Sequence, residues 1–215
     1  MLDTIFESIT RQDIEDYTKY WQSVTPMTEA DIFRRWLFAY MSIRNTWEGN
    51  LRGYNAIKDF EQWKDNKSTL DQILSDAKCG FHNKRTEFIW HFKELYFNDP
   101  SEFKKSDDES WETFRNRLVK VCKGIGVTKV SFTLEMCYPN SAEVTCFDTH
   151  MLRLYQAPSL KWDNEKGYNV YRNIEQDWVN RSKNIGASPY VARCFFWDRN
   201  QNQQDSRYWS YVLEG

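Results

Sequence analysis

Apolar residues recur at intervals of three and four along most of the chain, the spacing that places them on one face of an α-helix. At one helix start, a Thr28–Asp31 capping signal precedes an apolar series that includes Ile32 and Trp36. The same spacing predicts further helices over residues 13–21, 47–60, 68–80, 85–97, 111–121, 128–136, 150–155, 168–183 and 189–197. No segment alternates apolar and polar residues as a half-buried strand does, so the pattern predicts an all-α protein.

Breaks in this helical pattern are short. The 215 residues include only 8 Gly and 5 Pro, and no glycine-serine or proline-rich linker divides the chain. We therefore expect a single structural unit over residues 1–215. Within it we expect one lobe over residues 30–100, joined by the first and last helices, and a second lobe over residues 101–155.

The composition narrows the class of protein. Hydrophobic residues make up 40% of the chain and charged residues 28%, as in ordinary folded domains. No apolar run approaches the ~18 residues that a membrane span needs, and the first residues lack the basic and apolar regions of a secretory signal. We therefore expect a cytoplasmic protein without a membrane partner. The net charge of -2 argues weakly against a non-specific binder of polyanions.

The cysteines and the aromatic residues give two further indications about the class of protein. The five cysteines stand far apart and form no Cys-x-x-Cys pair, so we expect reduced, mostly buried thiols and neither a disulfide framework nor a zinc site. The histidines are too scattered to indicate a metal site. Aromatic residues make up 17% of the chain. They favour a core built from large rings, and they leave room for a few exposed rings that stack on bases.

One segment, residues 118–131, combines a Gly-x-Gly turn with basic residues. A predicted helix runs into Gly124-Ile125-Gly126, and a second predicted helix follows at once. Glycines permit positive φ and leave the amides at a helix N-terminus open to an anion such as phosphate. A purely structural tight turn is the alternative interpretation of the two glycines. Between Glu112 and Glu135 there is no acidic residue. The basic residues in this interval are Arg115, Arg117, Lys120, Lys123 and Lys129.

A second segment of interest lies about twenty residues further on. There Asp148 follows an apolar stretch and stands directly before a predicted helix, in the sequence Phe-Asp-Thr-His-Met-Leu-Arg. An aspartate in that position can simply be the N-cap of the helix, because its carboxylate accepts from the first free amides. A carboxylate in an apolar setting can also serve in catalysis.

Together, the two segments resemble those of the helix-hairpin-helix (HhH-GPD) DNA glycosylase superfamily, the base-excision enzymes. The strong match covers residues 118–155, and a looser one covers about 30–200, including residues 39–46. The resemblance implies a two-lobed helical bundle with a cleft between the lobes, and a monomeric repair enzyme of the nucleoid. It acts on double-stranded DNA that carries a damaged or modified base, which flips out of the stack. Only Cys194 follows Asp148, so we expect no iron–sulfur cluster and no other cofactor.

The resemblance also assigns roles to individual residues. It implies that Asp148 is the catalytic carboxylate, and that the hairpin over residues 123–129 grips the DNA backbone. Two wedges fill the space of the flipped base, one from Arg44 or Asn45 and one from the loop over residues 80–84. Plainer alternatives remain, because Arg44 can be a surface charge, Phe81 a packing residue and His150 a helix-start residue. The implied DNA-binding residues are Lys123, Gly124, Gly126, Arg44, Asn45, Phe81, His82 and His150.

The resemblance implies that the last helices return to the first lobe and line the base pocket. They carry many aromatic residues, most of which we expect in the core and one or two against the flipped base. These residues are Trp162, Tyr168, Tyr171, Trp178, Tyr190, Phe195, Phe196, Trp197, Tyr208, Trp209 and Tyr211.

The sequence departs from the family at the nucleophile. Members that also nick the strand carry a lysine two residues after the second hairpin glycine, where this chain has Thr128. Because a threonine cannot form a Schiff base, we expect a monofunctional enzyme in which Asp148 activates water. If the hairpin is one residue longer, Lys129 takes that place and lyase activity follows. Two other hypotheses are a phage-type enzyme of base hypermodification and a non-enzymatic hairpin protein that only binds DNA.

Overall fold

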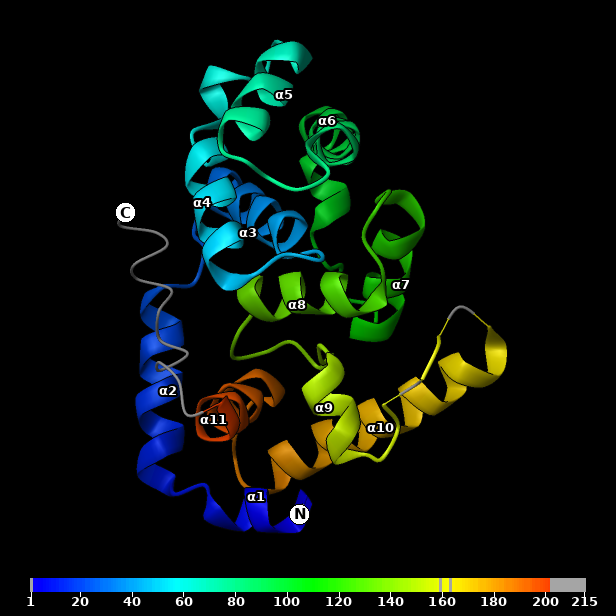
Figure 1. Ribbon diagram of the computed structural model, residues 1–215. Coiled ribbons are helices and arrows are strands. Elements are labelled where there is room, and N and C mark those ends of the chain that lie inside the picture. The colour runs from blue at the N-terminus through cyan, green and yellow to red at the C-terminus, as the bar shows by residue number, and fades with distance from the viewer. Residues whose placement is uncertain (1, 159, 163, 202–215) are drawn as a thin grey trace. The chain divides into compact units, whose positions relative to one another are not determined.

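The computed structural model describes residues 2–158, 160–162 and 164–201, and within these residues it contains helices and no strands. The predicted all-α fold is confirmed. Figure 1 shows the order of the helices along the chain. Contacts divide the described residues into two compact units, of which unit 1 runs up to Thr25 and again from Leu134 onward, and unit 2 is Pro26–Thr133. None of the described helices is both long enough and apolar enough to span a membrane.

Unit 2 is built around a cluster of large aromatic rings. Phe33 of α3 stacks on Phe92 of α6 with a centroid distance of 5.4 Å, and Trp36 packs 5.1 Å from the same ring. Tyr96 and Phe103 close the cluster. The aromatic excess therefore serves the core of this unit. Its elements are α3 (Glu29–Met41), α4 (Trp47–Ile57), η1 (Phe60–Gln62), α5 (Lys67–Asp76), α6 (His82–Asn98), η2 (Pro100–Phe103), α7 (Trp111–Val121) and the start of α8 (Val127–Cys137).

Unit 1 brings together the two ends of the described chain. In Figure 1, α11 lies beside α2, and the Trp21 and Tyr190 rings of these helices are 4.7 Å apart. Trp178 of α10 packs 4.8 Å from Phe6, and its indole N–H donates to the Pro189 carbonyl at 3.0 Å. The elements of unit 1 are α1 (Leu2–Ser8), α2 (Arg11–Ser23), the end of α8, α9 (Thr149–Leu154), α10 (Glu165–Asn184) and α11 (Pro189–Gln201).

The boundaries of these two units differ from those of the lobes that we expected. The stretch over residues 101–133 belongs with residues 30–100, because the hairpin before α8 packs on α3 and α6. The terminal helices belong instead with the chain after Leu134. The boundary falls inside α8, between Thr133 and Leu134. A cleft between lobes stays a prediction.

Most helix boundaries fall close to their predicted places. Thr28 caps α3 with a capping box to Asp31, and α7 covers the predicted residues 111–121. Some details were wrong, among them the end of the helix predicted over residues 68–80, which lies at Asp76. Asn66, two residues before the predicted start, caps α5 because its carboxamide oxygen accepts from the amides of residues 68 and 69, and the short helix α1 was not predicted. All five cysteines are buried, in agreement with the expectation of mostly buried thiols.

Candidate functional site

The turn between α7 and α8 depends on Gly124. This residue has φ 78°, and a Cβ atom there would lie 2.2 Å from Cδ2 of Phe88. Buried Ile125 and Val127 anchor the turn, and the Tyr40 hydroxyl donates to the Lys123 carbonyl at 3.2 Å. The turn is therefore packed firmly against α3 and α6.

Gly126 has a different role from Gly124. Its φ is not positive, and no atom lies within 4 Å of a Cβ built there. Its carbonyl accepts from the amides of Lys129 and Val130 in the first turn of α8. The amides that precede these two at the start of a helix have no carbonyl partner within the helix, and the open space at Gly126 allows an anion to approach those of α8.

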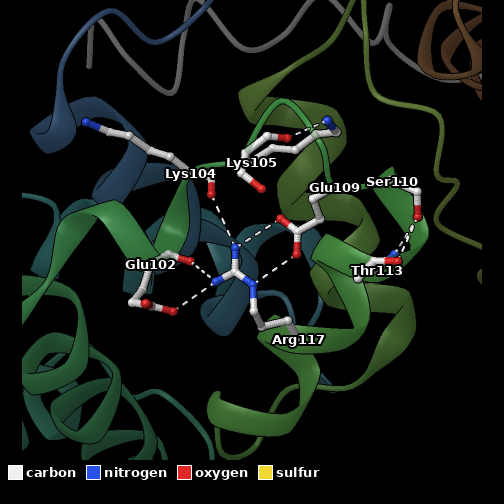
Figure 2. A network of polar contacts seen from close by, with 8 residues as sticks. Glu102, Lys104, Lys105, Glu109, Ser110, Thr113 and Arg117 are labelled. Atoms are coloured by element: carbon white, nitrogen blue, oxygen red, sulfur yellow. Dashed lines mark hydrogen bonds and ion pairs between the residues drawn. The ribbon is translucent and has the colours of Figure 1, made fainter.

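The charge on this segment is smaller than the sequence indicates. Arg115 is fully buried, with its Nε donating to the Asn116 side chain at 3.2 Å. Arg117 is taken up by acidic partners, as Figure 2 shows: its Nε lies 3.0 Å from Glu109 Oε1, and its Nη1 lies 3.0 Å from Glu102 Oε2. Neither arginine is placed to bind phosphate, which corrects the count of five available cations. The three remaining are Lys120, Lys123 and Lys129.

The Arg117 contacts predict a pH effect on stability. The hydrogen bond from Arg117 lowers the pKa of Glu109. The contribution of this contact to the free energy of unfolding is therefore complete above the ordinary glutamate pKa, and it is lost as pH falls through the lowered pKa. We expect Arg117→Gln to reduce the free energy of unfolding by about 1–2 kcal/mol at pH 7 and by less at pH 3. Urea titrations at both pH values measure this difference.

The same variant separates structure from DNA binding. Because Arg117 is engaged with Glu102 and Glu109, we expect Arg117→Gln to leave the salt dependence of DNA affinity unchanged. The matched variant Lys120→Gln removes an exposed cation on the same helix, and we expect it to lower that salt slope by about 1. A loss of slope in Arg117→Gln would contradict this assignment.

Asp148 stands at the start of α9. Its Oδ1 accepts from the amides of His150 and Met151 at 2.9 and 3.1 Å, so it is the N-cap that we had weighed as the plainer interpretation. The two amides fix the side chain through one oxygen. Oδ2 has no hydrogen-bond partner among the described residues, and the side chain is half-buried. The cap and a catalytic role are therefore compatible.

Buried side chains hold the extended segment that leads to Asp148. Glu135 of α8 accepts from the Cys146 amide at 3.2 Å, and Glu175 of α10 accepts from the Thr145 amide at 2.8 Å. The Tyr171 hydroxyl donates to the Thr145 carbonyl at 2.6 Å. These contacts fix the backbone on the approach to the carboxylate.

Glu135 itself is paired with an arginine of α11. Nη2 of Arg193 lies 2.7 Å from Glu135 Oε2, and its Nε donates to Oε1 at 2.9 Å. Burial raises the pKa of Glu135, and the Arg193 guanidinium opposes that rise. The sequence did not identify this pair, because the two residues are 58 positions apart and neither belongs to a motif.

The two predicted wedges lie on turns with unusual backbone. Arg44 has φ 48° after α3, and Phe81 has φ 59° at the start of α6. Both side chains are exposed, Phe81 to 67%. Positive φ in a residue other than glycine is strained, and such strain is retained where the surrounding structure enforces it. A surface position with these features suits an inserting side chain.

Two neighbours of these wedges are engaged in local contacts. The Asn45 carboxamide donates to the Met41 carbonyl at 3.2 Å and accepts from the Thr46 amide at 3.1 Å, which closes the turn after α3. Of the two alternatives for the first wedge, the structure therefore favours Arg44. His82 lies with its Nδ1 3.1 Å from Asp71 Oδ1, which leaves only its Nε2 for a phosphate.

Comparison with known protein families shows which family this chain matches. The family model described as 8-oxoguanine DNA glycosylase, of the helix-hairpin-helix type, matches residues 10–187. The chain belongs to this glycosylase family. It is accordingly an all-α DNA glycosylase with a helix-hairpin-helix motif, a DNA-binding enzyme of DNA repair.

Solved structures share the fold of this glycosylase. The 8-oxoguanine DNA glycosylase of Thermotoga maritima is 23% identical, with a TM-score of 0.66 over 91% of this chain and 90% of that chain. An 8-oxoguanine glycosylase/lyase of Methanocaldococcus jannaschii, in complex with a 15mer DNA containing 8-oxoguanine, is 20% identical, with a TM-score of 0.69 over 94% of this chain and 95% of that chain. No curated protein matches the chain.

In this glycosylase, the two candidate nucleophile positions lie side by side at the start of α8. The hydroxyl oxygen of Thr128 is buried and has no hydrogen-bond partner among the described residues. The Lys129 side chain is half-buried, with its Nζ 5.2 Å from the centre of the Phe132 ring. A pocket-lining position must be accessible to a base, and the Thr128 oxygen is not.

The aromatic residues of the glycosylase's last helices are mostly core. Tyr171, Trp178 and Tyr190 are buried, as are Phe195 and Phe196. Trp197 is half-buried, and its ring lies edge-on to the His150 ring at 5.1 Å, two residues from Asp148. Trp162 and Tyr168 are also half-buried. Tyr208, Trp209 and Tyr211 lie outside the described residues.

Proposed function

We propose that the protein excises 8-oxoguanine from double-stranded DNA. The match of the family model over residues 10–187 carries this proposal, because it spans both the hairpin and the Asp148 segment. The glycosylase/lyase that shares the fold was solved with DNA containing this lesion. The open Gly126 turn, with lysines near it, suits contact with the phosphate backbone.

We assign Asp148 the role of the catalytic carboxylate. When the bond between the base and the deoxyribose breaks, positive charge develops on the sugar, and the base leaves with the bonding electrons. A fixed carboxylate close to that charge stabilises it electrostatically. Oδ2 of Asp148, which has no hydrogen-bond partner in the part of the chain that the structure describes, is the atom suited to this role, because the two amides already hold Oδ1 in place.

For the nucleophile, burial of the Thr128 oxygen favours Lys129 over activated water. As the base leaves with the bonding electrons, the amine forms a bond to C1′ and gives up a proton, and the sugar ring then opens between C1′ and O4′ to give the Schiff base. Loss of a C2′ proton from this Schiff base expels the 3′-phosphate and so breaks the strand. Monofunctional excision, our expectation from the sequence, is the alternative. In that case Asp148 deprotonates the attacking water and an intact abasic site remains.

A single set of incubations tests both proposals. Duplexes with 8-oxoguanine opposite each of the four bases, and with other lesions, are incubated with enzyme and resolved with and without alkali. We expect excision of 8-oxoguanine, with nicking that does not need alkali. Borohydride reduces a Schiff base to a stable amine, so we expect a trapped protein–DNA adduct.

The controls assign the adduct to one residue. Lys129→Gln should abolish trapping of the adduct. Thr128→Val should still give the adduct, because valine has nearly the shape of threonine and only the hydroxyl is lost. Excision without trapping would mean that water is the nucleophile. A base altered without release would indicate a hypermodification enzyme, and binding without any base change would indicate a DNA-binding module.

A further inference from the structure

Arg85 connects the two strained turns from the inside of unit 2. It lies in the first turns of α6, and its side chain is buried. Its Nε donates to the Gly80 carbonyl at 2.8 Å, and its Nη2 donates to the Ile43 carbonyl at 2.6 Å. Gly80 and Ile43 are the residues directly before Phe81 and Arg44.

These two hydrogen bonds act at the points that set the wedge geometry. The carbonyl of Gly80 belongs to the peptide group on which Phe81 turns about φ, and the carbonyl of Ile43 does the same for Arg44. Both residues have positive φ, at 59° and 48°. Fixing the preceding peptide groups therefore fixes the direction in which each exposed side chain leaves the protein.

The remaining donors of Arg85 bind the end of α3. Nη1 donates to the Tyr40 carbonyl at 2.9 Å and reaches the Met41 carbonyl at 3.4 Å. The last carbonyls of a helix lack partners in the helix, and its negative dipole end favours a cation. Every acceptor of the Arg85 side chain among the described residues is a backbone carbonyl, so the guanidinium serves backbone position rather than an ion pair.

We propose that Arg85 is a positioning residue of the glycosylase, which couples the Arg44 turn to the Phe81 turn so that the two exposed side chains enter DNA as one unit. This inference rests on the proposed function, because it concerns the flipping of the target base. A planar guanidinium can reach both turns and the helix end at once, whereas the single ammonium of lysine cannot.

The test uses two duplexes that carry the same lesion and differ in the cost of flipping it. Flipping is easiest for a base without a pairing partner, so 8-oxoguanine is placed opposite cytosine or opposite a tetrahydrofuran abasic analogue. In single-turnover experiments at saturating enzyme, we expect Arg85→Lys to slow excision tenfold or more opposite cytosine and less than about threefold opposite the analogue. An equal loss on both substrates would show a merely structural role and overturn the proposal.

A matched control and a second pair of variants complete the test. Arg34→Lys changes another arginine that bonds a backbone carbonyl of unit 2, that of Lys58, and should slow neither substrate. If Arg85→Lys fails to fold, the exposed variants Arg44→Ala and Phe81→Ala still decide the matter. Their effects on the cytosine substrate should be non-additive, because the two side chains act as one unit. Additive effects would contradict the coupling.

A fluorescence measurement separates this proposal from the proposed function. In an Asp148→Asn background, 2-aminopurine beside the lesion brightens when the neighbouring base leaves the stack. We expect Arg85→Lys to reduce that signal on the cytosine duplex and not on the analogue duplex. If the wild-type protein excises no 8-oxoguanine, the proposed function fails, whereas an unchanged fluorescence signal counts against Arg85 alone.

Discussion

Asp148→Asn is expected to lower the rate of base excision by about 10²–10⁴-fold while leaving the fold intact. Asparagine is as good an N-cap as aspartate, and its carbonyl oxygen can keep the bonds that Asp148 Oδ1 makes to the amides of His150 and Met151. Only the negative charge is lost. Single-turnover excision and the thermal midpoint, measured on the same preparation, report the two properties separately.

Two further variants show that the effect belongs to this carboxylate. Asp99 caps η2 in the same way, with its Oδ1 accepting from the Ser101 amide at 3.0 Å, and Asp99→Asn should keep full activity. Asp148→Ala removes the cap as well as the charge, so it should also lose about 1 kcal/mol of stability. If Asp148→Asn excises at the wild-type rate, the catalytic group is elsewhere and the assignment is wrong.

Features that depend on neighbours in sequence could be predicted well. The capping box of Thr28 with Asp31 involves residues three apart, and the Gly-x-Gly turn and the Asp148 cap are equally local. The apolar periodicity of α7 and α10 reflects a face that each helix buries. Local chemistry was therefore enough for the fold class and for the position of both motifs.

Contacts between distant residues could not be predicted in this way. Arg85 meets Ile43 across 42 positions, and Arg117 meets Glu102 across 15 positions. In the sequence both arginines are simply cations, and nothing shows that one lies inside the protein and the other is neutralised. The same reason explains why the acid-free interval after Glu112 suggested more phosphate-binding charge than the folded chain offers.

Replacing each of the two hairpin glycines by alanine is expected to change a different property, stability at Gly124 and DNA affinity at Gly126. Gly124→Ala forces a Cβ to 2.2 Å from the Phe88 ring at φ 78°, so we expect it to lose about 2–5 kcal/mol of stability. Gly126→Ala meets no atom within 4 Å and should keep its stability, but its methyl group obstructs the approach of a phosphate. We expect its DNA affinity to fall about tenfold.

The contribution of Phe88 to the first of these effects can be isolated. Gly186 has nearly the same φ, 75°, with nothing within 4 Å of its Cβ position, so Gly186→Ala reports the backbone strain alone, about 1–2 kcal/mol. The excess loss in Gly124→Ala measures the clash, and adding Phe88→Ala should recover part of it. Urea unfolding and DNA binding measured on all four variants test the argument. Gly124 is required for the shape of the turn, whereas Gly126 leaves open the space through which an anion approaches. This difference requires that the Gly126→Ala variant be as stable as the wild type and bind DNA more weakly.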